Sequence, residues 1–304
     1  MTIKTPLIKS SLLSELNHCH VWLKMESSQP AGSFKQRSIG NACRQYAEKG
    51  AKKFISSSGG NAGISVAHIG NQLNIPVTVV VPKTTSQRAI ELMRKENAEV
   101  IVHGDFWTQA NELALSFVNA EAAYIHPFDD QYLWDGVAEI IDEILADGVQ
   151  PDAVVLSVGG GSLLSGIYQG LITNQLNIPI YAVETEGTAS LNAAIRTNQH
   201  VKLDKVTGVA TTLAAQQVCE NAFQISRQNP HINSLVVSDQ AAVSACVQFL
   251  DDHRTLVEPA CGATLSVLYD QKISFAADAQ VVVIVCGGAS ITQQQLAKYA
   301  NDLS

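Results

Sequence analysis

Short apolar runs rich in β-branched residues alternate with amphipathic segments along most of this 304-residue chain. This alternation predicts α/β organisation, because a strand that returns through a crossover helix pairs in parallel and leaves helices on both faces of the sheet. We expect nine strands, at His20–Met25, Lys53–Ser56, Val77–Val81, Glu99–His103, Ala123–Ile125, Ala153–Val158, Ile180–Val183, Leu235–Ser238 and Val281–Cys286. The clearest amphipathic helices are expected at Gln36–Lys49, Ser86–Glu96, Phe106–Asn119 and Trp134–Ala146. Nine strands are many for one sheet, so the expected fold has two doubly wound α/β lobes with mostly parallel sheets.

Three of the expected strands end in turns rich in glycine and serine. Val155–Val158 runs into Gly159-Gly160-Gly161-Ser162, and a helix is expected from Leu163 to Thr173. Such a turn exposes backbone N–H groups at the positive end of a helix, where a phosphate binds well. The other two turns are Ser58-Gly59-Gly60-Asn61-Ala62-Gly63 after Phe54–Ser56, and Cys286-Gly287-Gly288-Ala289-Ser290 after Val281–Val285. A ligand is expected at these turns, since the carboxyl ends of parallel strands line the binding crevice of α/β folds.

Lys35 follows a turn of small residues, Pro30-Ala31-Gly32, and an aromatic residue, Phe34. An isolated lysine at the start of a helix is ordinarily a solvated residue. In partly apolar surroundings, however, desolvation disfavours the ammonium form, and the neutral amine attacks carbonyl carbons. The place of Lys35 ahead of the Ser58–Gly63 turn therefore makes it a candidate Schiff-base lysine.

Charge and cysteine content argue against several classes of function. A net charge of −8 and a pI near 5.4 disfavour nucleic-acid binding and a basic membrane-surface role. The six cysteines show no Cys-x-x-Cys spacing and no clustered histidines, so a zinc site is not expected. The sequence contains no signal-peptide pattern and no apolar window of about 18 residues, so we expect a cytoplasmic protein that does not bind membranes.

Lys35 and the three glycine-rich turns resemble, in order and spacing, the fold-type II pyridoxal-phosphate (PLP) enzymes, and most closely their serine dehydratase/threonine deaminase branch. The resemblance covers nearly the whole chain. It implies a tryptophan synthase β-subunit-like fold, in which residues 1–35 and 132–304 form a large PLP-binding domain and residues 36–131 a small domain inserted into it. The cofactor would lie in the cleft between these domains.

The resemblance also implies roles for single residues. Lys35 would form the Schiff base with PLP and later move the α-proton of the substrate, and Phe34 would pack against one face of the cofactor ring. The phosphate would be held by Gly159, Gly160, Gly161 and Ser162. The substrate carboxylate would be held by Ser58, Gly59, Asn61 and Ala62. Asn61 would also bond the ring hydroxyl, and Cys286 would lie near the pyridine nitrogen.

Three of these positions distinguish the chain within the family. Ser162 stands where the family usually has a fourth glycine; serine keeps the backbone N–H but does not easily reach positive φ, which bears on the geometry of the turn. Ala62 stands where racemases and biodegradative deaminases of this fold usually have histidine. Cys286 is a neutral residue that would leave the ring nitrogen largely unprotonated, which favours expulsion of a β-leaving group.

Glu184 is a candidate ligand of a monovalent cation such as K⁺. In the family the matching glutamate binds the cation together with carbonyl oxygens, and the carbonyls of Thr188, Leu213 and Ala215 fall at the matching spacings. An oxygen-only ligand set suits a hard cation. The alternative is that Glu184 is a solvated acid at the end of a strand.

The resemblance implies an ammonia-lyase that converts L-serine, and L-threonine as a candidate second substrate, to pyruvate or 2-oxobutanoate and ammonia. Its partners would be the small amino acid and a second copy of the chain in a homodimer, with no nucleic acid. Two alternatives stay open from the sequence. One is another fold-type II reaction, such as serine racemisation or β-replacement. The other is a non-catalytic nucleotide-binding α/β protein that uses Gly159–Gly161.

Overall fold

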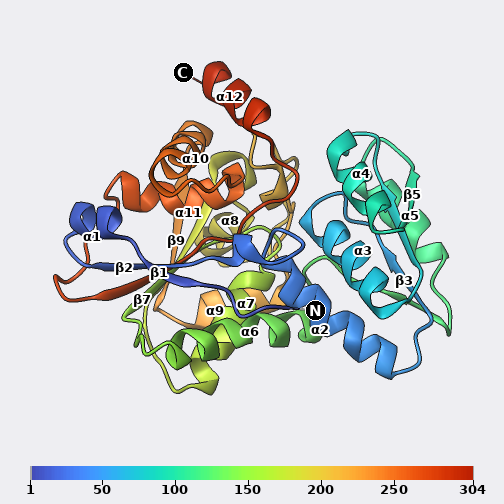
Figure 1. The fold of residues 1–304 in the computed structure, drawn as a ribbon, viewed down its shortest axis with the longest axis horizontal. Helices are drawn as coiled ribbons and strands as arrows, with labels where there is room; N and C mark the ends of the chain where they lie inside the picture. The colour runs from blue at the N-terminus through green and yellow to red at the C-terminus, as the bar shows by residue number, and fades with distance from the viewer. Residues whose placement is uncertain (1, 304) are drawn as a thin grey trace.

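Two separate sheets organise the chain in the computed structural model, which describes residues 2–303 (Figure 1). The larger sheet has the order β1-β2-β10-β7-β8-β9, formed by β1 (Leu7–Lys9), β2 (His20–Lys24), β10 (Gln280–Ile284), β7 (Ala153–Ser157), β8 (Ile180–Thr185) and β9 (Ile232–Val237). The smaller sheet has the order β5-β4-β3-β6, formed by β5 (Glu99–Val102), β4 (Val77–Val81), β3 (Lys53–Ser56) and β6 (Ala122–Tyr124). All of these strand pairs are parallel except β1 with β2, so the expected α/β class with mostly parallel sheets is confirmed.

Helices pack around each sheet, as parallel strands require. The larger sheet and its helices form the large lobe, with α1 (Ser11–Asn17), α6 (Gln131–Ala146), α7 (Ser162–Thr173), α8 (Ser190–Thr197), α9 (Glu220–Gln228), α10 (Asp239–His253), α11 (Pro259–Tyr269) and α12 (Gln293–Asp302). The smaller sheet forms the small lobe with α3 (Asn61–Leu73), α4 (Gln87–Lys95) and α5 (Trp107–Ser116). Helix α2 (Lys35–Glu48) joins the lobes, because it packs against both α6 and α3 (Figure 1). Within residues 2–303, no helix combines the length and the apolar character needed to cross a bilayer.

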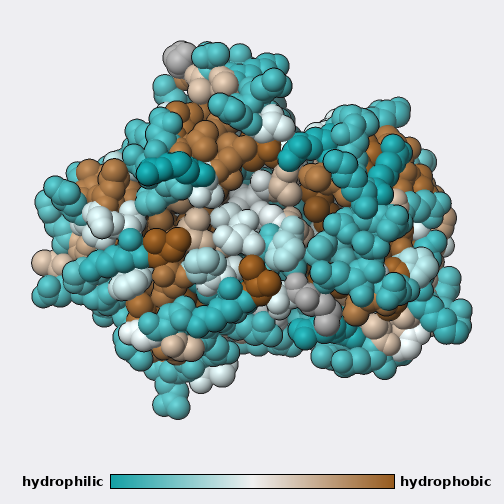
Figure 2. Space-filling model, in the orientation of Figure 1, coloured by the Kyte–Doolittle hydropathy of each residue, from teal (hydrophilic) through white to brown (hydrophobic). Residues whose placement is uncertain are grey.

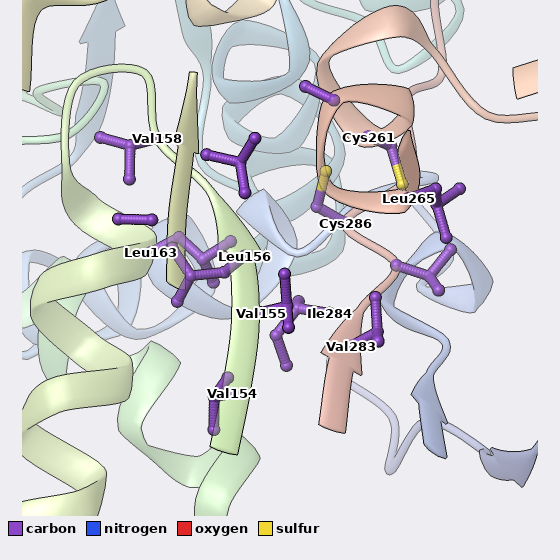
Figure 3. Packing of buried hydrophobic residues seen from close by; sticks show 14 of the residues in the cluster. Val154, Val155, Leu156, Val158, Leu163, Cys261, Leu265, Val283, Ile284 and Cys286 are labelled. Atoms are coloured by element: carbon purple, nitrogen blue, oxygen red, sulfur yellow. The ribbon is translucent and has the colours of Figure 1, made fainter. Parts of the chain in front are cut away.

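The central strands are buried on both faces, which explains why they read as continuous apolar runs. Every residue of β7 and of β4 is buried. In the core of the large lobe, Val154, Val155 and Leu156 of β7 lie near Val283 and Ile284 of β10 (Figure 3). Two further apolar clusters fill the small lobe, so each sheet is packed by its own side chains.

The expected strands are found, with differences at their ends. β3 and β4 span the expected residues. The prediction for β9 is wrong at its start, because the strand begins at Ile232, where the polar residues Asn233 and Ser234 break the apolar pattern. The sequence does not predict β1, a three-residue antiparallel edge strand that is too short to show an alternating pattern.

The start of α6 also differs from the prediction. The helix begins at Gln131 and not at Trp134, because the Asp130 carboxylate accepts a hydrogen bond from the Tyr132 N–H at 2.8 Å and caps the helix. The segment that leaves the small lobe after β6 therefore runs directly into α6.

A buried group of charges fixes the first turn of α2. The Arg37 guanidinium is 1% exposed, and it donates from Nε to Glu26 and from Nη1 to Glu143, both at 2.8 Å. Lys24 also donates to Glu143. Removing one member of such a buried group costs about 3–5 kcal/mol of folding free energy, because the remaining charges lose their partner. The network therefore holds α2 against β2 and α6 two residues after Lys35.

Candidate active site

Lys35 is the first residue of α2, and its amine reaches the start of α7. Its Nζ donates to the Ser162 Oγ at 2.9 Å and to the Pro127 carbonyl at 2.7 Å, and lies 5.0 Å from the centre of the Phe34 ring. Desolvation by the surrounding protein lowers the pKa of this amine to about 8. A neutral, nucleophilic amine is therefore accessible near neutral pH.

The turn after β7 leaves backbone N–H groups free at the start of α7. Gly161 has a left-handed φ of 95°, whereas Ser162 is already the first helical residue. Serine at position 162 is thus compatible with the turn, since only Gly161 needs positive φ. Within the described structure, the N–H groups of Gly159, Gly160, Gly161 and Ser162 donate to no protein acceptor. They are available to an anion at the positive end of α7.

The Ser58–Gly63 turn forms a second free helix start, on the small lobe. α3 begins at Asn61, and the described residues offer no acceptor to the N–H groups of Ser58, Gly59, Asn61 and Ala62. A Cβ added at Gly63 would lie 1.9 Å from the Ser58 carbonyl oxygen, so this tight turn requires glycine. A carboxylate fits such a helix start for the same reason as a phosphate.

The two lobes meet at the Asn61 side chain. Its Nδ2 donates to Glu258 Oε1 at 2.7 Å, and its Oδ1 accepts from the Ala289 N–H at 3.1 Å. Next to Lys35, the Phe34 N–H donates to the Cys286 carbonyl at 3.1 Å. This bond ties the Lys35 segment to the turn after β10. Figure 2 shows weakly polar residues, drawn pale, gathered where the lobes meet. The structure therefore brings Lys35 and all three glycine-rich turns together at the junction of the lobes.

Cys286 follows β10 and is buried. Its Sγ lies 3.6 Å from the Ser157 Oγ, and its sulfur lies near that of Cys261 (Figure 3). Hydrogen bonding with Cys261 and burial raise the pKa of the Cys286 thiol well above its ordinary value, so the thiol is neutral. A neutral group here lacks the charge that would keep a neighbouring ring nitrogen protonated.

Glu184 is fully buried in β8, so its interpretation as a solvated acid is wrong. Its two carboxylate oxygens accept hydrogen bonds from the N–H groups of Leu191 and Asn192, both at 2.8 Å, at the start of α8. Burial raises the pKa of Glu184 to about 8, and the amide hydrogen bonds act in the opposite direction. A bound cation would stabilise the ionised form further.

The three other residues expected to bind the cation lie in two turns of the large lobe. Thr188 is buried in the turn after β8. The Leu213 carbonyl accepts from the Ala215 N–H at 2.6 Å, and a Cβ added at Gly159 would lie 3.3 Å from that carbonyl oxygen. The Leu213 turn therefore borders the glycine turn after β7, while the cation site itself stays a prediction.

Four residues at the junction are not predicted from the sequence: His126, Phe128, Thr212 and Glu258. A Cβ added at Gly160 would lie 2.1 Å from the Phe128 ring, so this ring packs directly on the turn after β7. The His126 Nδ1 accepts hydrogen bonds from the Phe128 and Asp129 N–H groups at 3.2 and 2.7 Å. Burial, with a smaller effect of Lys35, lowers the pKa of His126 to about 4, so it is neutral.

The sequence around Glu258 indicates a helix start but no role for the carboxylate. Glu258 is an acid placed directly before Pro259 in an otherwise apolar stretch, and proline at the first helical position marks a helix start. Nothing nearby in the sequence points to its partner Asn61, 197 residues away. Among residues 2–303 there is no group of three or more His, Cys, Asp or Glu side chains arranged to bind a metal ion.

The chemistry of the site follows from these parts. A lysine amine with a lowered pKa lies 2.9 Å from a serine at a turn with free N–H groups, and a second set of free N–H groups starts a helix on the opposite lobe. This arrangement suits a phosphorylated carbonyl compound bonded to the lysine and a small carboxylate beside it.

Comparisons with known proteins agree with this chemistry. Residues 2–287 match the family described as "Pyridoxal-phosphate dependent enzyme". The chain is 44% identical to an L-serine dehydratase of Dictyostelium discoideum, over 99% of this chain and 91% of that protein. It is 42% identical to the human L-serine dehydratase/L-threonine deaminase, over 97% of this chain and 93% of that protein.

Among solved structures, a fungal L-serine ammonia-lyase from Rhizomucor miehei superposes with a TM-score of 0.94. It is 32% identical, and the match covers 100% of this chain and 99% of that one.

Proposed function

The chain belongs to the family of pyridoxal-phosphate dependent enzymes, and from this premise we propose that it is an ammonia-lyase acting on L-serine, and on L-threonine as a second substrate. The products are pyruvate or 2-oxobutanoate, and ammonia. The observation that carries the proposal is the Lys35 amine, held 2.9 Å from Ser162 at the free N–H groups of the α7 turn. The L-serine dehydratases that match nearly the full length of the chain support the substrate class.

The residues at the junction fit the cofactor. The free N–H groups of Gly159–Ser162 would hold its phosphate, the Phe34 ring would lie beside its ring, and Asn61 would bond its hydroxyl. Neutral Cys286 would face the ring nitrogen. When bound, the cofactor supplies a carbonyl carbon that reacts with amines and a ring that accepts electron density from the substrate.

The protein groups then position the substrate and move its proton. Ser58, Gly59, Asn61 and Ala62 would hold the carboxylate with their N–H groups. The neutral Lys35 amine would take the proton from the α-carbon, because its lowered pKa lets it act as a base near pH 8. Ala62 is buried and has no side chain able to donate a proton from that side, in keeping with elimination and not racemisation.

We further propose the domain division 1–35 and 132–304 against 36–131, a cytoplasmic location and a homodimer. The apolar clusters support the division, since the buried residues of the largest lie outside 36–131 and those of the two smaller ones lie within it, apart from Leu133 just past the boundary. Six free cysteines support a reducing compartment. Light scattering of the purified protein tests the homodimer, since a mass of 32.5 kDa would indicate a monomer.

A product assay tests the function. Purified protein loaded with pyridoxal phosphate is incubated with L-serine, L-threonine or D-serine, and ammonia, 2-oxo acid and D-serine are quantified. We expect equal amounts of ammonia and pyruvate from L-serine. Formation of D-serine without ammonia would replace the proposal with racemisation, and absence of any cofactor absorbance would favour a non-catalytic α/β protein.

The lowered pKa of Lys35 predicts how cofactor uptake depends on pH. Only the neutral amine attacks a carbonyl, so the rate at which cofactor-free protein bonds to added cofactor should rise with pH and reach half its maximum near pH 8. Stopped-flow absorbance measures this rate. A half-maximum near pH 10.5, the value of an ordinary lysine, would show that desolvation does not act on the amine.

The buried Glu184 predicts activation by K⁺ that grows with pH. A cation binds the ionised carboxylate, and below a pKa of about 8 a proton competes for it. The apparent K⁺ affinity should therefore rise roughly tenfold or more from pH 6 to pH 8. Activity is measured in K⁺ and in tetramethylammonium at pH 6 and at pH 8. Glu184→Gln should remove the difference in activity between the two salts. Identical kinetics in both salts would argue against the cation site.

A further inference from the structure

Glu258 is a buried carboxylate at the junction of the lobes to which the proposed mechanism gives no role. It is 5% exposed and precedes the first turn of α11. Its Oε1 accepts two hydrogen bonds of 2.7 Å, one from Asn61 Nδ2 on the small lobe and one from Thr212 Oγ1 on the large lobe. One carboxylate oxygen thus connects the turn proposed for the substrate carboxylate with the turn that borders Gly159.

A third segment encloses the same carboxylate. Gly288 lies so close that an added Cβ would fall 2.4 Å from both Cδ and Oε2 of Glu258. The next residue, Ala289, donates its N–H to Asn61 Oδ1 at 3.1 Å. Asn61 is therefore held at both ends of its amide by groups on the large lobe.

These two contacts leave the Asn61 amide one orientation. An ionised carboxylate only accepts hydrogen bonds, and a backbone N–H only donates them. A flipped amide would direct its oxygen at Glu258 and its NH₂ group at the Ala289 N–H, which would break both hydrogen bonds. Glu258 consequently determines which atom of Asn61 remains on the side of the Ala289 turn.

We propose that Glu258 is a positioning residue that orients the Asn61 amide and holds the Ser58–Gly63 turn against the Thr212 turn for substrate binding. This inference rests on the proposed function of Asn61. Because the ionised carboxylate makes the stronger hydrogen bonds, the positioning is pH-dependent. Burial raises the pKa of Glu258 to about 7, against the effect of the Thr212 and Asn61 hydrogen bonds.

Among residues 2–303, the groups that interact with Glu258 include thiols and no cation. Cys246 of α10 and Cys286 after β10 interact electrostatically with it. Burial raises the pKa of the Cys246 thiol, and a hydrogen bond from Cys261 together with burial raises the pKa of the Cys286 thiol. Tyr299 of α12 lines the same small cavity as Glu258. The Nε of Arg88, in α4, donates a hydrogen bond to the Ala289 carbonyl at 3.1 Å. The ionised form is therefore stabilised by Asn61 and Thr212 and not by an ion pair.

The test compares four variants of the cofactor-loaded enzyme: Glu258→Ala, Glu258→Gln, Thr212→Val and the control Arg88→Gln. The first removes the acceptor, the second keeps a neutral acceptor oxygen, the third removes one donor, and the control removes a different contact between the lobes. kcat and KM for L-serine are measured from pH 5.5 to 9. Hydrogen–deuterium exchange of residues 58–66 is followed in parallel.

We expect Glu258→Ala to raise KM about tenfold or more, with a smaller fall in kcat, and to speed exchange at residues 58–66. We expect wild-type kinetics to decline below pH 7, as Glu258 becomes protonated. Glu258→Gln should stay within about threefold of wild type at pH 8 and lack this decline. Thr212→Val should change KM in the same direction by about threefold, which keeps the test valid if Glu258→Ala fails to fold.

Stability supplies a readout independent of turnover. Because the pKa of Glu258 is raised from 4.5 to about 7, the folded state binds the extra proton, and wild-type stability falls as pH rises between these values. Glu258→Gln should lack this part of the decline. Equal kinetics for the Gln and Ala variants, or exchange at residues 58–66 unchanged by Glu258→Ala, would overturn the positioning role. If wild type does not act on L-serine, the proposed function fails, while exchange and stability still decide the role of Glu258.

Discussion

Lys35→Ala should lower kcat for L-serine by about 10⁴-fold or more and leave a folded protein. The loss is large because one amine is proposed both to bond the cofactor and to move the α-proton. The fold should tolerate the change to within about 1 kcal/mol, since the half-buried Lys35 side chain donates two hydrogen bonds within the described structure and its removal relieves a desolvated amine. Turnover, thermal unfolding and cofactor content are the measurements.

Borohydride reduction provides the decisive comparison for Lys35. Wild type should keep the cofactor after reduction and denaturation, whereas the variant should release it even if the α7 turn still binds the phosphate. Lys83→Ala is the matched control, because Lys83 is exposed on the small lobe. Full activity of the Lys35 variant would remove this residue from the mechanism.

The second large effect is expected at Cys286. Cys286→Asp should lower ammonia release about 100-fold, because a carboxylate within hydrogen-bonding distance of the ring nitrogen would keep that nitrogen protonated and change how the ring accepts electrons. Cys286→Ser should keep activity to within about fivefold, since both side chains are neutral and similar in size. Product analysis and absorbance spectra of both variants are recorded at equal cofactor loading.

Stability must be measured with the Cys286 variants, because the site is buried and close to Glu258. An aspartate there is costly to ionise, so thermal unfolding separates a misfolded variant from a folded, inactive one. If folded Asp and Ser variants have the same activity, Cys286 does not face the ring nitrogen and is a buried thiol at the end of a strand.

The parts of the site that the sequence predicts are those with a local signal. The residues of a glycine turn between a strand and a helix are consecutive in the sequence. The sequence therefore predicts the Gly159–Ser162 and Ser58–Gly63 turns. Ser162 replaces the fourth glycine of the family pattern, and the sequence does not give its φ. Within this turn the structure has positive φ at Gly161 and a helical conformation at Ser162, so serine fits at this position.

The parts that the sequence does not predict depend on contacts between distant segments. Thr212 shows no motif, and Glu258 shows only a helix start before Pro259. They matter because folding brings Glu258 to both Thr212 and Asn61, which lie on different lobes. The sequence pattern does not predict the start of β9 either, for a related reason. Polar residues continue that strand because backbone pairing with β8 decides its length, and not the apolar pattern.

The position of Lys35 has a mechanical consequence. The chain enters the small lobe through α2 and leaves it through the segment after β6. The Lys35 amine, at the start of α2, donates to the Pro127 carbonyl in the segment that leaves and to the Ser162 Oγ on the large lobe. One side chain thus links both connections between the lobes to the turn at the start of α7.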